Sequence, residues 1–127
     1  MSSSSDARRA AGQAAEQFNH QRLIAQGWSC LGRNVRTRWA EVDWLGTPPD
    51  QRVLVAVEVK ARQGLCPVGP HELLRPRQRR RLLRALEGIA QQIGWTADLR
   101  LDLVHVELLG PAPVRADHWP DVSSLST

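Results

Sequence analysis

The stretch VLVAVEVKAR, Val53–Arg62, constrains the fold of this chain more than any other. Its apolar and β-branched residues favour a strand at the centre of a sheet. Because residues two apart in a strand share a face, the valines at odd positions line one face. Glu58, Lys60 and Arg62 then lie on the other face. This strand therefore carries charged groups inside an otherwise buried run.

Lys60 is the only lysine among 17 basic residues, since the other sixteen are arginines. A formal net charge of +4 and a pI of about 10.4 suit a polyanionic partner, although base bias in a genome also produces arginine-rich chains. Such bias converts lysine to arginine at positions where either residue is tolerated, whereas a site that needs a compact ammonium keeps its lysine. Lys60 is therefore a better functional lead than any arginine.

The 127 residues predict one domain, residues 7–110, between a disordered tail, residues 1–6, and a Pro/Ser-rich tail, residues 111–127. Two helices and four strands are expected within it: a helix from Ser5 or Asp6 to about Gln26, strands Trp28–Val35 and Trp39–Leu45, a third strand ending near Arg62, a helix Pro76–Ile93 and a strand Leu99–Leu109. Gly27 and Gly94 act as helix stops. The order predicts an α/β fold with an αβββαβ core and a mixed sheet flanked by helices.

Two carboxylates on the second strand, Glu41 and Asp43, also share a face. A hairpin can bring Asp43 beside Glu58, and two carboxylates that close repel unless a divalent cation lies between them. Mg²⁺ suits one or two carboxylates with water and substrate phosphate. Lys60 would then orient or deprotonate a water, or stabilise the charge that develops on a phosphoryl group. The structural alternative is an ordinary Glu58–Lys60 ion pair on a solvated strand.

The axial position of Asp43 is open at this stage. With GTPPDQ as a tight connection, Asp43 lies four residues, about 13 Å, from Glu58. A wider connection, roughly Thr47 to Leu54, or a bulge would place the two carboxylates side by side. Both alignments keep the carboxylates on the same face.

The arrangement AEVDWLG, then VLVAVEVKAR, resembles the core of PD-(D/E)xK nucleases and, more closely, the motifs of the YraN-like family of predicted bacterial endonucleases. RNVRTR at Arg33–Arg38, RPRQRRRLLRAL and LRLDLVHVEL are similar to further family segments. The resemblance covers about Gly12 to Leu109. It implies a restriction-endonuclease-like fold, related to Holliday junction resolvases, and hydrolysis of DNA phosphodiesters with Mg²⁺ or Mn²⁺.

Carried over by position, the resemblance implies Asp43 and Glu58 as metal ligands and Lys60 as the catalytic lysine. Glu16 on the first helix would be an additional acidic residue that holds the metal or its waters. Glu41 is a weaker candidate, because a shared face does not bring it within reach of the metal. The family's lysine on the second helix is replaced here by Gln78.

Arginines cluster at the start of the second helix, where the positive helix end also attracts phosphate. Contacts of this kind recognise the shape of a nucleic acid and depend strongly on salt. The candidate nucleic-acid-binding residues are Arg36, Arg38, Arg62, Arg75, Arg77, Gln78, Arg79, Arg80, Arg81 and Arg84. The tryptophans are expected to pack in the core or at its edge, and none of the four histidines is assigned to a metal.

Three functions remain open: a metal-dependent endonuclease acting on branched or structured DNA, with a homodimer for paired incisions; a non-catalytic nucleic-acid-binding module in a repair, recombination or uptake assembly; and a protein-interaction domain.

No small-molecule cofactor or membrane partner is expected. The absence of an apolar signal core predicts a cytoplasmic protein. Cys30 and Cys66 are expected to be free thiols.

Overall fold

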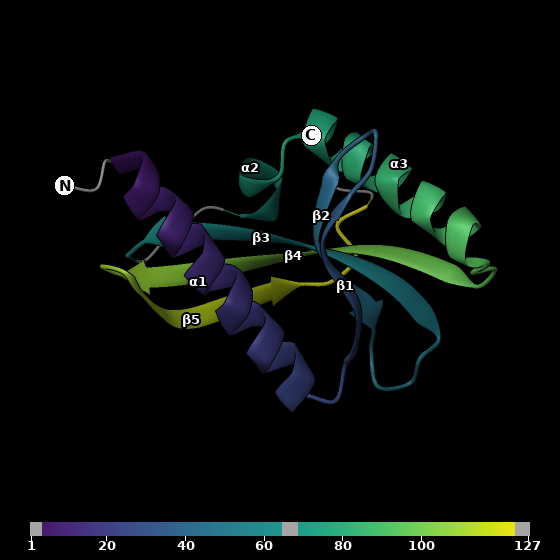
Figure 1. The fold of residues 1–127 in the computed structure, drawn as a ribbon, viewed down its shortest axis with the longest axis horizontal. Coiled ribbons are helices and arrows are strands. Elements are labelled where there is room, and N and C mark those ends of the chain that lie inside the picture. The colour runs from purple at the N-terminus through teal and green to yellow at the C-terminus, as the bar shows by residue number, and fades with distance from the viewer. Residues whose placement is uncertain (1–3, 65–68, 124–127) are drawn as a thin grey trace.

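The structure is a computed structural model that describes residues 4–64 and 69–123. A five-stranded sheet has the order β1-β2-β3-β4-β5 (Figure 1). The elements along the chain are α1 Ser4–Ala25, β1 Ser29–Arg36, β2 Glu41–Thr47, β3 Val53–Gln63, α2 Pro70–Leu73, α3 Pro76–Ile93, β4 Asp98–Leu109 and β5 Ala112–Trp119.

The sheet is mixed, because β3 and β4 run parallel while the other neighbouring strands are antiparallel. The crossover from β3 to β4 contains α2 and α3, as parallel neighbours require a long connection. Helix α1 lies across one face of the sheet and α3 lies on the other side (Figure 1). The predicted α/β class, the αβββαβ order and the flanking helices are confirmed.

Strand β3 is buried on both faces, which explains its nearly continuous apolar sequence. Leu54 and Ala56 belong to the core that α3 covers. Val55 and Val57 belong to a second core beneath α1. At Glu58 the first of these two faces changes from apolar to charged, so the charged residues lie where β3 leaves the core.

Both helix stops that the sequence predicts have the backbone conformation that favours glycine. Gly27 follows α1 with φ 91°, and Gly94 caps α3 with φ 75°. The start of α1 differs from the prediction, because the helix begins at Ser4. The predicted disordered tail is therefore wrong for residues 4–6, where Asp6 adds favourable negative charge to the first helical turn. Residues 1–3 lie outside the described residues.

The C-terminal segment corrects a second boundary. Residues 111–127 were expected as a loosely held tail, yet Ala112–Trp119 forms β5 and pairs with β4. A turn at Gly110, with φ 61°, reverses the chain, and Pro113 is tolerated because β5 is an edge strand. Beyond β5, Val122 is buried and its backbone N–H donates to the Leu101 carbonyl at 2.7 Å. The domain therefore extends to at least residue 123, and residues 124–127 lie outside the described part.

Other expectations concern single residues or short segments. The segment 63–70, between the predicted third strand and second helix, includes the last residue of β3 and the first residue of α2, and residues 65–68 lie outside the described part. Cys30 is a half-buried free thiol, whereas Cys66 falls in that undescribed segment. In the described ranges, no helix is both long and apolar enough to cross a membrane.

Candidate active site

The pairing of β2 with β3 answers the question of axial position. Trp44 pairs with Val57 in the antiparallel ladder. Continuing the same register by one residue places Asp43 opposite Glu58. The described pairing of these two strands has no register shift, so the wider connection of the two alternatives is present. The backbone N–H of Val59 donates to Asp43 Oδ2 at 2.9 Å. This bond holds the Asp43 carboxyl group beside the point where β3 becomes charged.

Glu58, Lys60 and Gln78 form a closed group of contacts between β3 and α3. Glu58 is buried, and its Oε2 lies 3.2 Å from Lys60 Nζ. The same oxygen accepts a hydrogen bond of 2.8 Å from Gln78 Nε2. Lys60 Nζ in turn donates to Gln78 Oε1 at 3.1 Å. Gln78 therefore contacts both charged groups, a role that the sequence alone did not reveal.

The Asp43 carboxyl group has an unusual affinity for protons. Burial is the main reason that its pKa is raised to about 8, and the negative charge of Glu58 and a side-chain hydrogen bond with Glu58 raise it further. The Val59 N–H and the Lys60 ammonium oppose this shift. In the absence of a cation, Asp43 is consequently protonated at neutral pH. A carboxyl group whose pKa is raised by burial and by a neighbouring acid is typical of a functional site.

Glu16 approaches this group from α1. Its Oε1 accepts a hydrogen bond of 3.0 Å from Asn34 Nδ2, and Asn34 has φ 49°, a backbone conformation that asparagine tolerates. Burial raises the pKa of Glu16, the Asn34 bond lowers it, and the charges of Asp43 and Glu41 raise it. Glu16 and Glu41 also line a cavity of about 690 Å³ between α1 and the β1–β2 hairpin. Glu41 itself is exposed.

The structure therefore brings together Asp43, Glu58 and Lys60, with Glu16 near Asp43. Sequence reasoning missed the contact of Asn34 with Glu16, although RNxRxR contains that asparagine. His105, one of the four histidines not assigned to a metal, lies opposite Lys60 in the register of the parallel strands β3 and β4. His105 is 2% exposed and its Nε2 has no hydrogen-bond partner.

The donor atoms at the site fit a hard divalent cation. Within the described ranges, no group of three or more His, Cys, Asp or Glu side chains could hold a metal ion. The chain would thus offer the two carboxylates of Asp43 and Glu58, with Glu16 positioned to hold a metal-bound water. Mg²⁺ binds in this way, because it retains several waters and takes few protein ligands. The raised pKa of Asp43 supports the fit, since a cation would replace the proton between the two acids.

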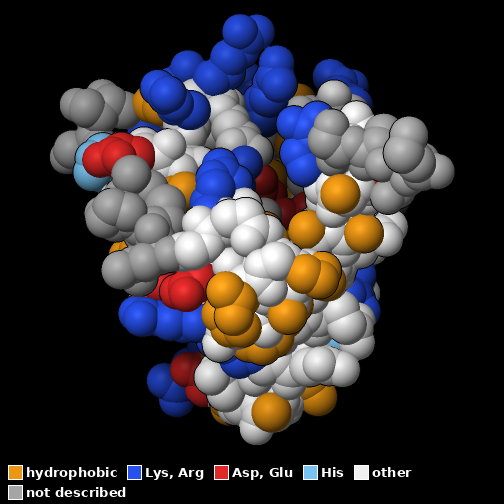
Figure 2. Space-filling model, turned by 90° about the vertical axis from the view of Figure 1, so that its left-hand side faces the viewer, with side chains coloured by type: hydrophobic (Ala, Val, Ile, Leu, Met, Phe, Trp, Pro, Cys, Tyr) orange, Lys and Arg blue, Asp and Glu red, His pale blue; other side chains and the backbone are white. Residues whose placement is uncertain are grey.

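Basic side chains surround the acidic ones at this end of the molecule. In Figure 2, Lys and Arg side chains gather around a hollow in which acidic side chains are visible. The candidate nucleic-acid-binding arginines that are exposed are Arg36, Arg38, Arg62, Arg75, Arg77, Arg80, Arg81 and Arg84.

Arg79 departs from the prediction of a surface phosphate contact. It is only 9% exposed, and its Nη1 has no hydrogen-bond partner. Its position explains the burial, because residues spaced three and seven apart on a helix share a face, and Arg79 shares its face with Leu82 and Leu86. Arg79 is therefore removed from the exposed arginine surface.

The tryptophans pack as expected. Trp44 is 1% exposed, lies edge-on to Trp28, and donates from its indole nitrogen to His20 Nδ1 at 3.0 Å. Trp39 packs against α3, where a Cβ at Gly88 would come within 2.5 Å of the indole ring. Trp44 thus connects β2 to α1, and Trp39 packs the β1–β2 hairpin against α3.

A match to a known family and several relatives agree with the resemblance noted from the motifs. The family described as Uncharacterised protein family UPF0102 matches residues 15–106. A UPF0102 protein of Herpetosiphon aurantiacus is 32% identical over 130 residues, which cover 93% of this chain and 97% of the relative. A UPF0102 protein of Anaeromyxobacter dehalogenans is 35% identical over 116 residues, covering 91% and 84%.

Among solved structures, a repair endonuclease from Pyrococcus abyssi has a TM-score of 0.45 and 19% sequence identity to this chain, and the match covers 80% of this chain and 39% of that chain. The sequence matches establish the identity: the chain belongs to family UPF0102, the YraN family.

Proposed function

We propose that this protein is a divalent-metal-dependent endonuclease that hydrolyses phosphodiester bonds in branched or structured DNA. The observation that carries the proposal is the position of Lys60 Nζ, 3.2 Å from a buried Glu58 whose neighbour across the ladder is Asp43. Carboxylates for a cation and an ammonium for phosphoryl charge are the two parts that this hydrolysis needs. Figure 2 shows acidic side chains in a hollow surrounded by Lys and Arg side chains, and such basic groups can bind phosphate.

Asp43 and Glu58 would hold a Mg²⁺ or Mn²⁺ ion, which when bound polarises a phosphoryl oxygen and lowers the pKa of a coordinated water. Lys60 would orient the attacking water or stabilise the charge on the phosphoryl oxygens through Nζ. Gln78 holds Nζ at 3.1 Å and Glu58 at 2.8 Å, so both side chains are positioned before substrate arrives.

The exposed arginines support a DNA substrate recognised by its shape. Arg77 and Arg80 lie near the start of α3, where side chains and the helix end both favour phosphate. Contacts to phosphate position a nucleic acid without reading its bases. A branched DNA that requires two symmetric incisions would be served by a homodimer with two such sites.

The test is cleavage of four labelled DNAs with Mg²⁺ or Mn²⁺: a four-way junction, a flap, a single strand and a blunt duplex. We expect cleavage of at least one structured substrate, and a loss of 100-fold or more in Asp43→Asn and Lys60→Ala, as expected when a catalytic group is removed. Asp50→Asn is the matched control, because Asp50 is an exposed acid in the β2–β3 connection.

Absence of cleavage with both metals on all four substrates would contradict the proposal. So would full activity of both site variants. Salt-sensitive DNA binding that EDTA and Lys60→Ala leave unchanged, without cleavage, would identify the protein as a binding module of the same fold.

A further inference from the structure

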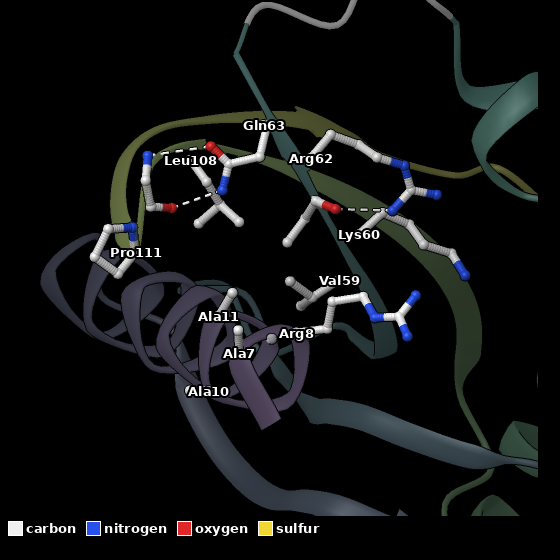
Figure 3. A pocket seen from close by; sticks show the side chains of 13 residues that line it. Ala7, Arg8, Ala10, Ala11, Val59, Lys60, Arg62, Gln63, Leu108 and Pro111 are labelled. Carbon is white, nitrogen blue, oxygen red and sulfur yellow. Dashed lines mark hydrogen bonds between the residues drawn. The ribbon is translucent and has the colours of Figure 1, made fainter. Parts of the chain in front are cut away.

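A cleft of about 990 Å³ lies beside the candidate active site, between the first turns of α1 and the C-terminal end of β3. Figure 3 shows Ala7 and Ala11 of α1 facing Val59 and Leu108 of the sheet across this cleft. Lys60 lines the cleft and also contacts Glu58 of the site. Lys60 therefore belongs both to the lining of the cleft and to the site.

The cleft joins an apolar surface to a positive edge. Of its thirteen lining residues, three are basic and none is acidic. The charged ends of Arg8, Lys60 and Arg62 extend toward the same side of the cleft, whereas Pro111 lies at the opposite end (Figure 3). A ligand that fits this distribution has an apolar part and an anionic part at one end.

The end near Pro111 is closed by the side-chain amide of Gln63, which bonds to the backbone of Gly110. Gln63 Nε2 donates to the Gly110 carbonyl at 2.6 Å, and the Gly110 N–H donates to Gln63 Oε1 at 3.1 Å. The nitrogen and the oxygen of the Gln63 side-chain amide are therefore both hydrogen-bonded within the protein. The closed end consequently favours recognition by shape and apolar contact over hydrogen bonds to one particular base.

We infer that this cleft binds an unpaired nucleotide of a DNA strand, with its base on the alanine and valine surface and its phosphate toward Arg8, Lys60 and Arg62. The inference rests on the proposed function and names the part of the substrate that lies beside the reacting phosphate. A base in a duplex must break its pairing and stacking to enter, at a cost of a few kcal/mol, whereas an unpaired base enters at a smaller cost. The cleft would thus select substrates with unpaired nucleotides.

The experiment measures equilibrium binding in EDTA, so that it does not depend on cleavage. The probes are a fluorescent flap DNA, the same flap with one abasic site next to the junction, and a blunt duplex. The filling variant is Ala7→Trp, because Ala7 is exposed and lines the cleft. The matched control is Ala25→Trp, an exposed alanine of the same helix outside the cleft.

We expect Ala7→Trp to weaken flap binding about tenfold, because the indole fills the space in which the base would bury its apolar surface, and to leave duplex binding within about twofold. The abasic flap should bind wild-type protein about tenfold more weakly. It should bind Ala7→Trp as weakly as the intact flap does, because both changes remove the same contact. Equal unfolding midpoints of the two tryptophan variants would show that both are folded.

Three outcomes would overturn the inference: no effect of Ala7→Trp on the flap, an equal effect on flap and duplex, or independent effects of the variant and the abasic site. A shift of oligomeric state in Ala7→Trp alone, measured by sedimentation, would also overturn it, because a second copy would then occupy the cleft. Failure of cleavage with intact flap selectivity would instead contradict only the proposed catalysis.

Discussion

Gln78 Nε2 donates a hydrogen bond of 2.8 Å to Glu58 Oε2 and so joins helix α3 to strand β3 at the candidate site. Because the same amide accepts a bond from Lys60 Nζ, its two ends match the two charges in front of it. An amide can do this only in one orientation, with nitrogen toward the carboxylate and oxygen toward the ammonium. Gln78, at a position where the resemblance implies a lysine, therefore connects Glu58 with Lys60.

Gln78→Ala should lower the cleavage rate about tenfold with little change in KM, because Lys60 and Glu58 lose a shared partner that positions them. Steady-state kinetics on the substrate that is cut best would measure the change. Gln91→Ala is the control, since Gln91 is an exposed glutamine of the same helix. An unchanged rate in Gln78→Ala would restrict Gln78 to holding the fold.

Metal affinity should rise with pH. The pKa of Asp43 is about 8, since burial and the neighbouring Glu58 disfavour its charged form. A metal ion must displace this proton, so below pH 8 the affinity for Mn²⁺ should fall about tenfold per pH unit. Calorimetry in buffers of different ionisation enthalpy would count the released proton. Asp43→Asn should abolish the pH dependence, whereas a slope that persists in this variant would assign the proton to another group.

The metal-free protein should lose stability as pH rises from about 4 to 8. Asp43 binds its proton more tightly in the folded state, with a pKa of about 8, than at its ordinary value of 3.8. Raising the pH through this window therefore favours the unfolded chain. Asp43→Asn should reduce the decline, which urea unfolding at pH 5 and pH 8.5 would show. Equal declines in both proteins would contradict the assignment, and Asp50→Asn serves as the exposed control.

Asp102 is the centre of a second polar cluster, on the α1 side of the sheet. It is fully buried and accepts bonds from Arg100 at 2.8 and 3.0 Å, from His118 at 2.8 Å and from the Asp121 N–H at 3.0 Å. Burial alone would raise its pKa, but these partners together lower it. Arg22 Nη2, which can only donate, lies 3.1 Å from His118 Nδ1, so His118 carries its proton on Nε2 toward Asp102.

Asp102→Asn should lower the free energy of unfolding by about 3 kcal/mol, because the fully buried Asp102 charge is the ion-pair partner of Arg100. Asp117→Asn should cost less than about 1 kcal/mol, since its pair with Arg115 is exposed. Because the folded pKa of Asp102 is lowered, its contribution is present above the unfolded value and is lost as pH falls through the folded one. Equal losses in the two variants, by urea unfolding at pH 7, would contradict the distinction.

The main elements could be predicted from the sequence because their signals are local. The alternation in Val53–Arg62 and the glycines after each long helix fix strands and helix ends through nearby residues. The register of Asp43 with Glu58 could not be fixed, because it depends on how many connecting residues remain unpaired. The β5 strand was missed since its proline-rich composition favours a tail, and only pairing with β4 makes it a strand.

Local sequence patterns also could not predict the contacts of Gln78 and Asn34 that complete the site. Gln78 lies 20 residues from Glu58, and Asn34 lies 18 residues from Glu16. Each bond depends on how a helix packs against a strand, which spacing alone does not determine. The burial of Arg79 was within reach, because its spacing from Leu82 and Leu86 places it on the apolar face of α3. The cluster of basic residues around Arg79 obscured that signal.

Arg79 and Arg80 should therefore respond differently to substitution. Arg80→Ala removes an exposed charge and should weaken DNA binding, with the slope of log K against log salt reduced by about 1. Arg79→Met should leave DNA binding unchanged and keep or raise stability, because the buried guanidinium has a nitrogen without a partner and methionine fills similar space. Fluorescence titrations at several salt concentrations and urea unfolding would measure both. Equal losses of DNA affinity would show that Arg79 reaches the nucleic acid, contrary to its buried position.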